Sequence, residues 1–196
     1  MPKRRLAVLL SGRGSNLEAI ADAVECGEIP EAEIVAVISD VPEARGLASA
    51  KARGLPAFAI DRAAHPSRRA HEEAVLGLLA ERRPDLVCLA GYMRLLSPAF
   101  VGRWKGRLLN IHPALLPKFP GLEVQRRALE AGEAESGCTV HFVDEGVDSG
   151  PIVLQRKVPI LQGDTEELLS RRILAEEHRA YPEAIAKVLG ELEKKA

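Results

Sequence analysis

Short apolar runs alternate with stretches of helical periodicity along the first half of the chain. The runs cover residues 6–10, 34–38, 57–60 and 86–89, and the third is the weakest. After the first run, Leu17, Ile20, Ala21 and Val24 recur at the spacing of a helix that packs on a sheet. Residues 44–53 and 68–82 predict two further helices, each of which is followed by Gly or Pro. Continuous apolar strands joined by amphipathic helices indicate a parallel sheet with helices on both faces.

The pattern changes after residue 105. Residues 107–113, RLLNIHP, predict another strand, and residues 125–131 predict a helix. The apolar runs 138–143 and 152–158 flank an acidic turn that contains glycine, which is typical of a β-hairpin with a long loop. Antiparallel pairing is therefore expected in the second half of the chain.

The last segment predicts one more helix. Asp164, with Glu167 three residues later, is expected to start it, and Pro182 interrupts the pattern. We therefore expect a single α/β domain over residues 1–196. Its fold class is an open Rossmann-like sheet, parallel in the N-terminal half and mixed in the C-terminal half, with helices on both faces.

Charge and cysteine content narrow the class of protein. The 27 basic and 28 acidic residues leave a net charge of -1, so no broad basic surface is expected, and neither nucleic acid nor membrane is predicted as a partner. The apolar stretch at residues 6–10 is too short to span a bilayer. Cys26, Cys88 and Cys138 are odd in number and widely spaced, which argues against a disulfide framework and fits a cytoplasmic protein.

A glycine-rich loop, SGRGSN at residues 11–16, joins the first strand to the first helix. Gly12 and Gly14 permit backbone angles that strain other residues, and they let bare amides approach a ligand. Ser15 and Glu18 form a capping-box pattern, so the helix is expected to begin here. The exposed N–H groups and the positive end of the helix dipole favour an anion such as a phosphate.

Other interpretations of this loop are weaker. A dinucleotide fingerprint requires Gly where Leu17 stands, and the Gly-Lys-Ser/Thr sequence of a P-loop is absent. Asp40, at the end of the second strand, gives only thin support for a ribose-binding acid. An ordinary tight turn between strand and helix stays open as the alternative to a phosphate site.

Asn110 and His112 end an apolar run in the segment LLNIHPALLPKFPG. Residues two apart in a strand point to the same side, so both side chains are expected to face one pocket. Pro113, Pro117 and Pro120 exclude a helix there and stiffen the loop that follows. An amide donates hydrogen bonds to an oxyanion without titrating, and an imidazole also moves a proton near neutral pH.

Asp148, in the hairpin loop, is the acid expected beside this pair. A carboxylate there would raise the pKa of His112 and hold the ring protonated. Such a set suits attack of an amine on a carbonyl-like carbon through a tetrahedral intermediate. A structural role at a strand end is the alternative for His112, and His141 is interpreted as lying on the wetter face of its strand. No metal is expected, and Cys88 falls in a strand core without a base placed beside it.

Five segments resemble the folate-dependent glycinamide ribonucleotide formyltransferases. They are SGRGSNLEAI, LAGYMRLLSP, LLNIHPALLPKFPGL, TVHFVDEGVDSGPI and EEHRAYP, which follow in order over about residues 5–185. The wider group of folate formyltransferases and hydrolases shares the Asn-x-His and Asp set. The continuation HPALLPKFPG and the loop SGRGSN point to the members that use the ribonucleotide.

The resemblance implies transfer of a formyl group from 10-formyltetrahydrofolate, the co-substrate, to the glycyl amine of the ribonucleotide in purine biosynthesis. It gives Asn110 and His112 the stabilisation of the oxyanion and the proton transfer, and it gives Asp148 the role of raising the histidine pKa. It also divides the chain into a nucleotide-binding half, residues 1–105, and a catalytic and folate-binding half, residues 106–196.

The binding residues also follow from the resemblance. The ribonucleotide phosphate is assigned to Gly14, Ser15 and Asn16, and the ribose hydroxyls to Glu177. The folate is assigned to a set of pocket residues: Arg68, Met93, Arg94, Leu95, Leu96 and Asn110. Arg69 is adjacent to Arg68, so either could contact the benzoyl-glutamate end. The chain departs from the family pattern at Cys138, Asp144 and Gly146, of which the last two bear on the mobility of the hairpin loop.

Three other functions are weighed against this one. A formyltetrahydrofolate hydrolase would use water on the same trio, but it would not require the phosphate loop or Glu177. A methionyl-tRNA formyltransferase would require a second, basic domain. A binding module without catalysis is disfavoured by the presence of both His112 and Asp148. We expect small-molecule substrates and a monomer or homodimer.

Overall fold

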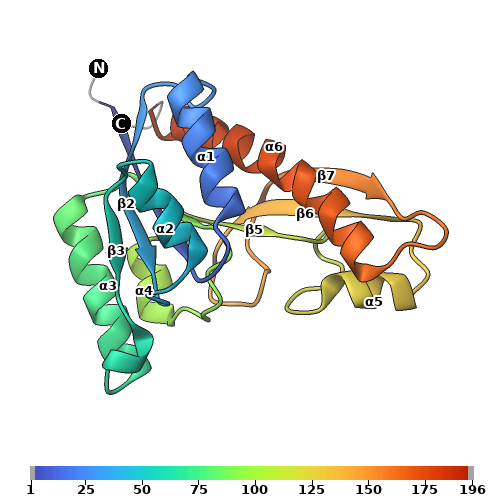
Figure 1. Ribbon diagram of the computed structural model, residues 1–196, viewed down its shortest axis with the longest axis horizontal. Helices are drawn as coiled ribbons and strands as arrows, with labels where there is room; N and C mark the ends of the chain where they lie inside the picture. Colours follow the sequence, from blue (N-terminus) through green and yellow to red (C-terminus); the bar gives the residue numbers. More distant parts are fainter. Residues whose placement is uncertain (1–2, 194–196) are drawn as a thin grey trace.

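The computed structural model of the protein describes residues 3–193 and contains one seven-stranded sheet (Figure 1). Its order is β3-β2-β1-β4-β5-β6-β7. The strands are β1 (Arg4–Leu10), β2 (Ala32–Ser39), β3 (Ala57–Ala59), β4 (Leu86–Leu89), β5 (Leu108–His112), β6 (Glu135–Phe142) and β7 (Ile152–Pro159). The first five pair in parallel, whereas β6 runs antiparallel to both β5 and β7. The predicted change from a parallel to a mixed sheet is confirmed.

Helices cover both faces of the sheet, as predicted (Figure 1). They are α1 (Ser15–Cys26), α2 (Arg45–Ala52), α3 (Arg68–Arg82), α4 (Pro98–Arg103), α5 (Val124–Glu130) and α6 (Glu166–Glu193), with a short 3-10 turn η1 (Arg62–Ala64). Because side chains alternate along a strand, β1 contributes to two cores. Leu6, Val8 and Leu10 pack with α1, α2 and α6, whereas Ala7 and Leu9 pack with α3 and α4.

The predicted start of α1 at Ser15 is correct, but its predicted cap and the predicted start of α6 are wrong in detail. Gly14, with φ of +82°, is the N-cap of α1 and makes no side-chain cap, so Ser15 and Glu18 do not form a capping box. Glu18 instead accepts a hydrogen bond from Ser49 on α2, at 2.9 Å. The last helix begins at Glu166, because Thr165 accepts from the Leu168 N–H at 3.3 Å.

Asp164 and Pro182 do not have the roles predicted for them in the last helix. Asp164 does not cap α6 but binds the Arg172 guanidinium at 2.6 and 2.9 Å. The helix also continues through Pro182 to Glu193. Helix α4 was not predicted, although Ser97 and Pro98 carry a start signal: the Ser97 hydroxyl accepts from the Phe100 N–H, and Pro98 occupies the first turn.

The order of the sheet reverses between β1 and β4, which lie next to each other. From β1 the chain passes to β2 and β3 on one side, and then returns to β4 and β5 on the other. Loops that leave the carboxyl ends of strands at such a point diverge and form the usual ligand crevice of open α/β sheets. Here the loops after β1 and β4 are tied together, since Ser11 N donates to the Gly91 carbonyl at 3.0 Å and Met93 N donates to the Ser11 hydroxyl at 2.9 Å.

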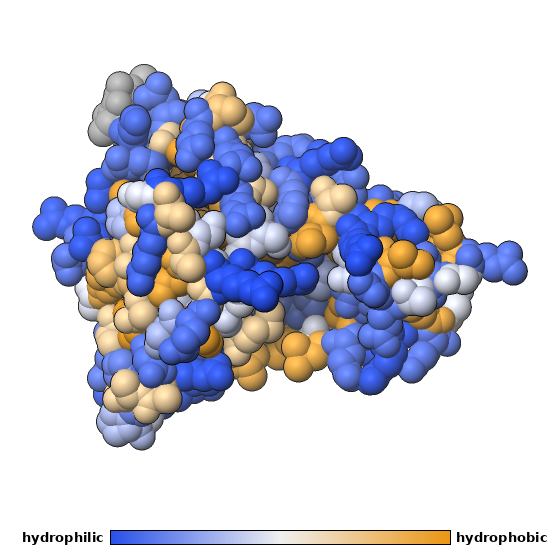
Figure 2. All heavy atoms as spheres, viewed as in Figure 1, coloured by the Kyte–Doolittle hydropathy of each residue, from blue (hydrophilic) through white to orange (hydrophobic). Residues whose placement is uncertain are grey.

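The surface of the face that carries α1, α2 and α6 is mostly hydrophilic (Figure 2). Figure 2 shows hydrophilic residues over most of this face, with hydrophobic ones in scattered groups. Among residues 3–193, no helix is both long enough and apolar enough to cross a membrane.

Candidate active site

The structure brings Asn110, His112 and Asp148 together at the end of β5. Asn110 and His112 lie in the C-terminal part of β5, which pairs with β6. Asp148 comes from the loop between β6 and β7. The His112 Nδ1 is 3.3 Å from one Asp148 carboxylate oxygen, and the Asn110 Nδ2 donates to the other at 3.4 Å. Residues 36 to 38 positions apart in sequence thus form one polar cluster.

Both ring nitrogens of His112 face acceptors. Nε2 donates to the Phe119 carbonyl at 2.8 Å, and Nδ1 faces the Asp148 carboxylate. A carbonyl only accepts, so Nε2 carries a proton, and the second proton, on Nδ1, is the one that Asp148 stabilises. The side chain of His112 is only 6% exposed.

The net shift of the His112 pKa differs in direction from the sequence-based expectation. Burial lowers this pKa, and it outweighs the hydrogen bond to Phe119 and the charge of Asp148, which raise it; the charges of His141 and Arg127 lower it further. Asp148 therefore raises the pKa, as expected, but the net shift is downward because desolvation of the ring exceeds the attraction of the acid.

Asp148 is held in a backbone conformation that non-glycine residues seldom adopt, with φ of +50°. Burial raises the pKa of its carboxyl group, but the hydrogen bonds from His141 and Gly121 and the charge of His112 outweigh burial, so the pKa is lowered. The Gly121 N–H donates to the carboxylate at 2.9 Å. Asp148 is therefore an ionised acceptor at neutral pH.

His141 belongs to this cluster, and its assignment to a wet strand face is wrong. The residue is 2% exposed and lies opposite Asn110 in the pairing of β5 with β6. Its Nδ1 donates to the Phe142 carbonyl at 2.8 Å, and its Nε2 lies 3.2 Å from the Asn110 amide nitrogen and 3.5 Å from Asp148. The Asn110 amide is thereby engaged with His141 and Asp148.

The loop after β5 is fixed by Thr139 and Gln155. The Thr139 hydroxyl donates to the Ala114 carbonyl at 2.6 Å and accepts from the Leu116 N–H at 3.1 Å. The Gln155 amide donates to both Thr139 and the Leu116 carbonyl, at 2.8 Å each. These bonds use the full capacity of the hydroxyl and set the direction in which the chain leaves His112.

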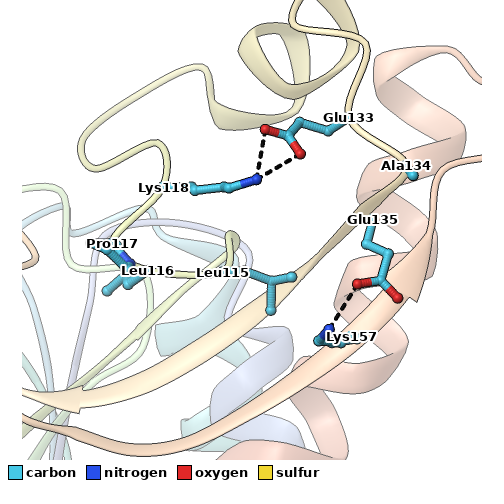
Figure 3. A pocket seen from close by; sticks show the side chains of 8 residues that line it. All are labelled: Leu115, Leu116, Pro117, Lys118, Glu133, Ala134, Glu135 and Lys157. Atoms are coloured by element: carbon cyan, nitrogen blue, oxygen red, sulfur yellow. Dashed lines mark hydrogen bonds and ion pairs between the residues drawn. The ribbon is translucent and has the colours of Figure 1, made fainter.

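A hollow borders the other side of this proline-containing loop (Figure 3). The ion pairs Lys118–Glu133 and Lys157–Glu135, each at 2.8 Å, flank it (Figure 3). It is lined by Leu115, Leu116, Pro117, Lys118, Glu133, Ala134, Glu135 and Lys157. These residues do not include the predicted catalytic trio, so we do not assign the hollow to the chemistry.

The predicted phosphate loop forms the N-terminus of α1. Gly14 and Asn16 are buried, and the Asn16 amide donates to Glu177 on α6 at 2.8 Å. The Asn16 Oδ1 is buried and has no partner among the described residues. Burial raises the pKa of Glu177, whereas the Asn16 hydrogen bond and the charge of Arg13 oppose that rise. The structure thus joins Asn16 to Glu177, from elements 161 residues apart in sequence.

Gly14 allows two backbones to approach closely. A Cβ atom at Gly14 would lie 2.3 Å from the Gly46 Cα, and φ is +82°. We expect Gly14→Ala to lower the free energy of unfolding by at least about 2 kcal/mol, because both sterics and backbone angle oppose a side chain. Denaturant unfolding measures the change. Gly12→Ala is the matched control, since nothing lies within 4 Å of its Cβ, and an equal loss in both variants would contradict the close approach.

The segment assigned to the folate lies beside this loop. Met93 and Leu95 are 66% and 68% exposed, which is unusual for large apolar side chains. Arg68 binds Glu72 at 3.0 Å, and the same Glu72 oxygen accepts from the Ser97 N–H at 3.0 Å. Arg69 instead pairs with Glu73 and points to solvent, with 90% of its side chain exposed. Of the two arginines, Arg68 is the one connected to the segment that contains Arg94 and Leu96.

Other residues considered from the sequence lie outside this cluster. Burial raises the pKa of Cys88 and of Cys138 to about 12, so neither thiol supplies a nucleophile at neutral pH. Asp40 is buried and pairs with Arg62 at 3.2 Å. Asp144 closes the hairpin loop, because it accepts from Gly146 N and the Ser149 hydroxyl. Within residues 3–193, no group of three or more His, Cys, Asp or Glu side chains is placed to hold a metal ion.

Comparison with known proteins gives consistent matches. A family model described as formyl transferase matches residues 4–185. The chain is 45% identical over 181 residues to phosphoribosylglycinamide formyltransferase of Escherichia coli (strain K12), covering 92% of this chain and 85% of that one. It resembles the crystal structure of glycinamide ribonucleotide transformylase 1 from Symbiobacterium toebii, with a TM-score of 0.92 and 53% identity over 96% of this chain and 89% of that chain.

Longer relatives match as well. The trifunctional purine biosynthetic protein adenosine-3 of Drosophila pseudoobscura pseudoobscura is 53% identical over 94% of this chain. The chain spans 14% of the length of that relative.

Proposed function

Since this chain belongs to the formyl transferase family, we propose that it transfers a formyl group from 10-formyltetrahydrofolate to the glycyl amine of phosphoribosylglycinamide, a step of purine biosynthesis. The observation that carries this proposal is the cluster of Asn110, His112 and Asp148 at the carboxyl end of β5. Relatives named for this activity match over most of both chains, which supports the choice of substrate.

The folate supplies the formyl group, and the chain supplies hydrogen bonds and a proton path. As an amine attacks a carbonyl carbon, negative charge grows on the carbonyl oxygen, and preorganised N–H donors stabilise it. Asn110 and His112 are those donors in our proposal. The His112 Nε2–H now binds the Phe119 carbonyl, and the Asn110 Nδ2 now contacts Asp148 and His141. Both donors must therefore exchange a present partner for the substrate oxygen during the reaction.

Asp148 supports this role by electrostatics. The carboxylate keeps a negative charge beside His112 Nδ1 and favours the imidazolium when the ring accepts a proton. The His141 Nε2 also lies close to the Asp148 carboxylate, 3.5 Å from its Oδ1. The imidazole of His112 is a residue type that moves protons near neutral pH, and the adjacent carboxylate supports that role in our proposal.

The substrate-binding residues in the proposal fit the two ligands. The free N–H groups at the start of α1 suit a phosphate at Gly14, Ser15 and Asn16. The unpartnered Asn16 Oδ1 and the buried Glu177 carboxylate are acceptors suited to ribose hydroxyls. Exposed Met93 and Leu95, with Arg94 and Leu96 beside them in the chain, suit an apolar ring. Arg68, which is linked to this segment through Glu72 and the Ser97 N–H, suits an acidic end.

An assay with and without the ribonucleotide tests the function. The purified chain is mixed with 10-formyltetrahydrofolate labelled in the formyl group, and label is followed in formate and in the ribonucleotide. We expect label in phosphoribosylglycinamide, and deformylation that depends on its presence. Release of formate at the same rate without the ribonucleotide would instead identify a formyltetrahydrofolate hydrolase, and no deformylation at all would identify a binding module.

A further inference from the structure

Arg127, on α5, binds the backbone of the segment Phe119–Leu122 through its guanidinium group. Its Nη1 donates to the Pro120 carbonyl at 2.7 Å and to the Leu122 carbonyl at 3.3 Å. Its guanidinium carbon lies 5.4 Å from the centroid of the Phe119 ring, within the range of a cation–π contact. One planar side chain therefore contacts three of the four residues of this segment.

The same segment presents two backbone groups to the candidate active site. The Phe119 carbonyl accepts from His112 Nε2 at 2.8 Å, and the Gly121 N–H donates to Asp148 at 2.9 Å. One group therefore sets the orientation of the imidazole, and the other sets the position of the acid. An error in the position of this segment would be transmitted to both catalytic side chains.

Few hydrogen bonds fix the segment Phe119–Leu122 in place. Among the hydrogen bonds of residues 3–193, those of Phe119–Leu122 run only to His112, Asp148 and Arg127. Phe119 has φ of +54°, which a non-glycine residue keeps only when its surroundings enforce it, and Leu122 is 77% exposed. Arg127 is thus the group outside the active site that fixes this backbone.

We propose that Arg127 is a positioning residue, which holds Phe119 and Gly121 against His112 and Asp148. The inference rests on the catalytic roles given to His112 and Asp148 in the proposed function. Arg126 is the natural comparison, because it is adjacent on the same helix but binds only Glu123 and Glu130 among the described residues.

The test compares Arg127→Met and Arg127→Lys with Arg126→Met and Arg126→Lys in the full chain. Methionine keeps the apolar stem and removes the donors, whereas lysine keeps the charge but not the planar fork that reaches two carbonyls and stacks on a ring. Two quantities are measured: kcat and KM for formyl transfer, and the exchange rate of the Gly121 amide proton with water by NMR. The exchange measurement needs no substrate, so it tests whether Arg127 holds the segment Phe119–Leu122 even if the wild-type protein transfers no formyl group.

We expect both Arg127 variants to lose kcat by about 10- to 100-fold, with each KM changing little. We also expect Gly121 exchange to be faster by about tenfold or more, because its N–H is no longer held against Asp148. The Arg126 variants should match the wild-type protein in both quantities. If Gly121 exchanges at the wild-type rate in the Arg127 variants, Arg127 does not hold this segment. If exchange is faster but kcat stays at the wild-type value, the position of the segment does not matter for catalysis. Recovery of kcat in Arg127→Lys alone would show that charge, not positioning, matters.

Discussion

Replacing His112 by alanine is expected to lower kcat for formyl transfer about 10²–10⁴-fold, the usual effect of removing a positioned acid or base. The variant loses both the donor at Nε2 and the ring that Asp148 would hold as an imidazolium. Binding of the ribonucleotide should survive, because its proposed site lies on α1 and α6 rather than on β5. Steady-state kinetics and a direct measurement of the ribonucleotide Kd separate the two effects.

His65→Ala is the matched control for this change. His65 also binds a backbone carbonyl, that of Asp61, at 2.8 Å, but it lies next to η1 and away from the trio. It should keep wild-type turnover. Near-normal kcat in His112→Ala would contradict the catalytic role assigned to the imidazole ring. A loss of both kcat and ribonucleotide binding would indicate that His112 has a structural role.

Elements with strong apolar patterns could be predicted from the sequence almost to the residue. Strand β4 and helix α3 have the expected bounds, Leu86–Leu89 and Arg68–Arg82, because burial on a sheet dictates their residue types. The capping box at Ser15 and Glu18 failed because the N-cap is Gly14, in the left-handed conformation, so that Ser15 lies inside the helix. Pro182 did not end α6, so a strong local preference was overridden in the folded protein.

The parts of the site that depend on local spacing could likewise be predicted from the sequence, whereas the parts that depend on long-range contacts could not. The spacing of Asn110 and His112 is local, so it could be predicted that both lie at one end of a strand. The place of His141 depends on the pairing of β5 with β6, and the Phe119 carbonyl and Gly121 N–H are backbone groups that no residue type reveals. The direction of the His112 pKa shift depends on burial, which spacing does not give.

Asp148→Asn is expected to lower kcat about 10²-fold or more, although the two side chains have nearly the same size. The amide has no negative charge, so the attraction that raises the pKa of His112 disappears while burial continues to lower it. The imidazolium is therefore less populated at every pH. We expect the pH profile of kcat to move to lower pH for the step that depends on protonated His112, and the wild-type and variant profiles measure this shift directly.

Acid stability gives a second and independent measure of the same charge. The pKa of Asp148 is lowered in the folded protein, so its ionised form stabilises the fold at pH above the ordinary carboxyl value. That stabilisation is lost as the pH falls through the lowered pKa. The free energy of unfolding of Asp148→Asn should therefore fall less steeply with acid than that of the wild-type protein.

Asp144→Asn provides the control, because Asp144 lies in the same loop but binds Gly146 and Ser149 rather than a histidine. It should keep the wild-type pH profile of kcat. A profile for Asp148→Asn that coincides with the wild-type one would show that the pKa of His112 does not depend on this carboxylate. The Nδ1-to-carboxylate contact at 3.3 Å would then be a structural feature without a part in catalysis.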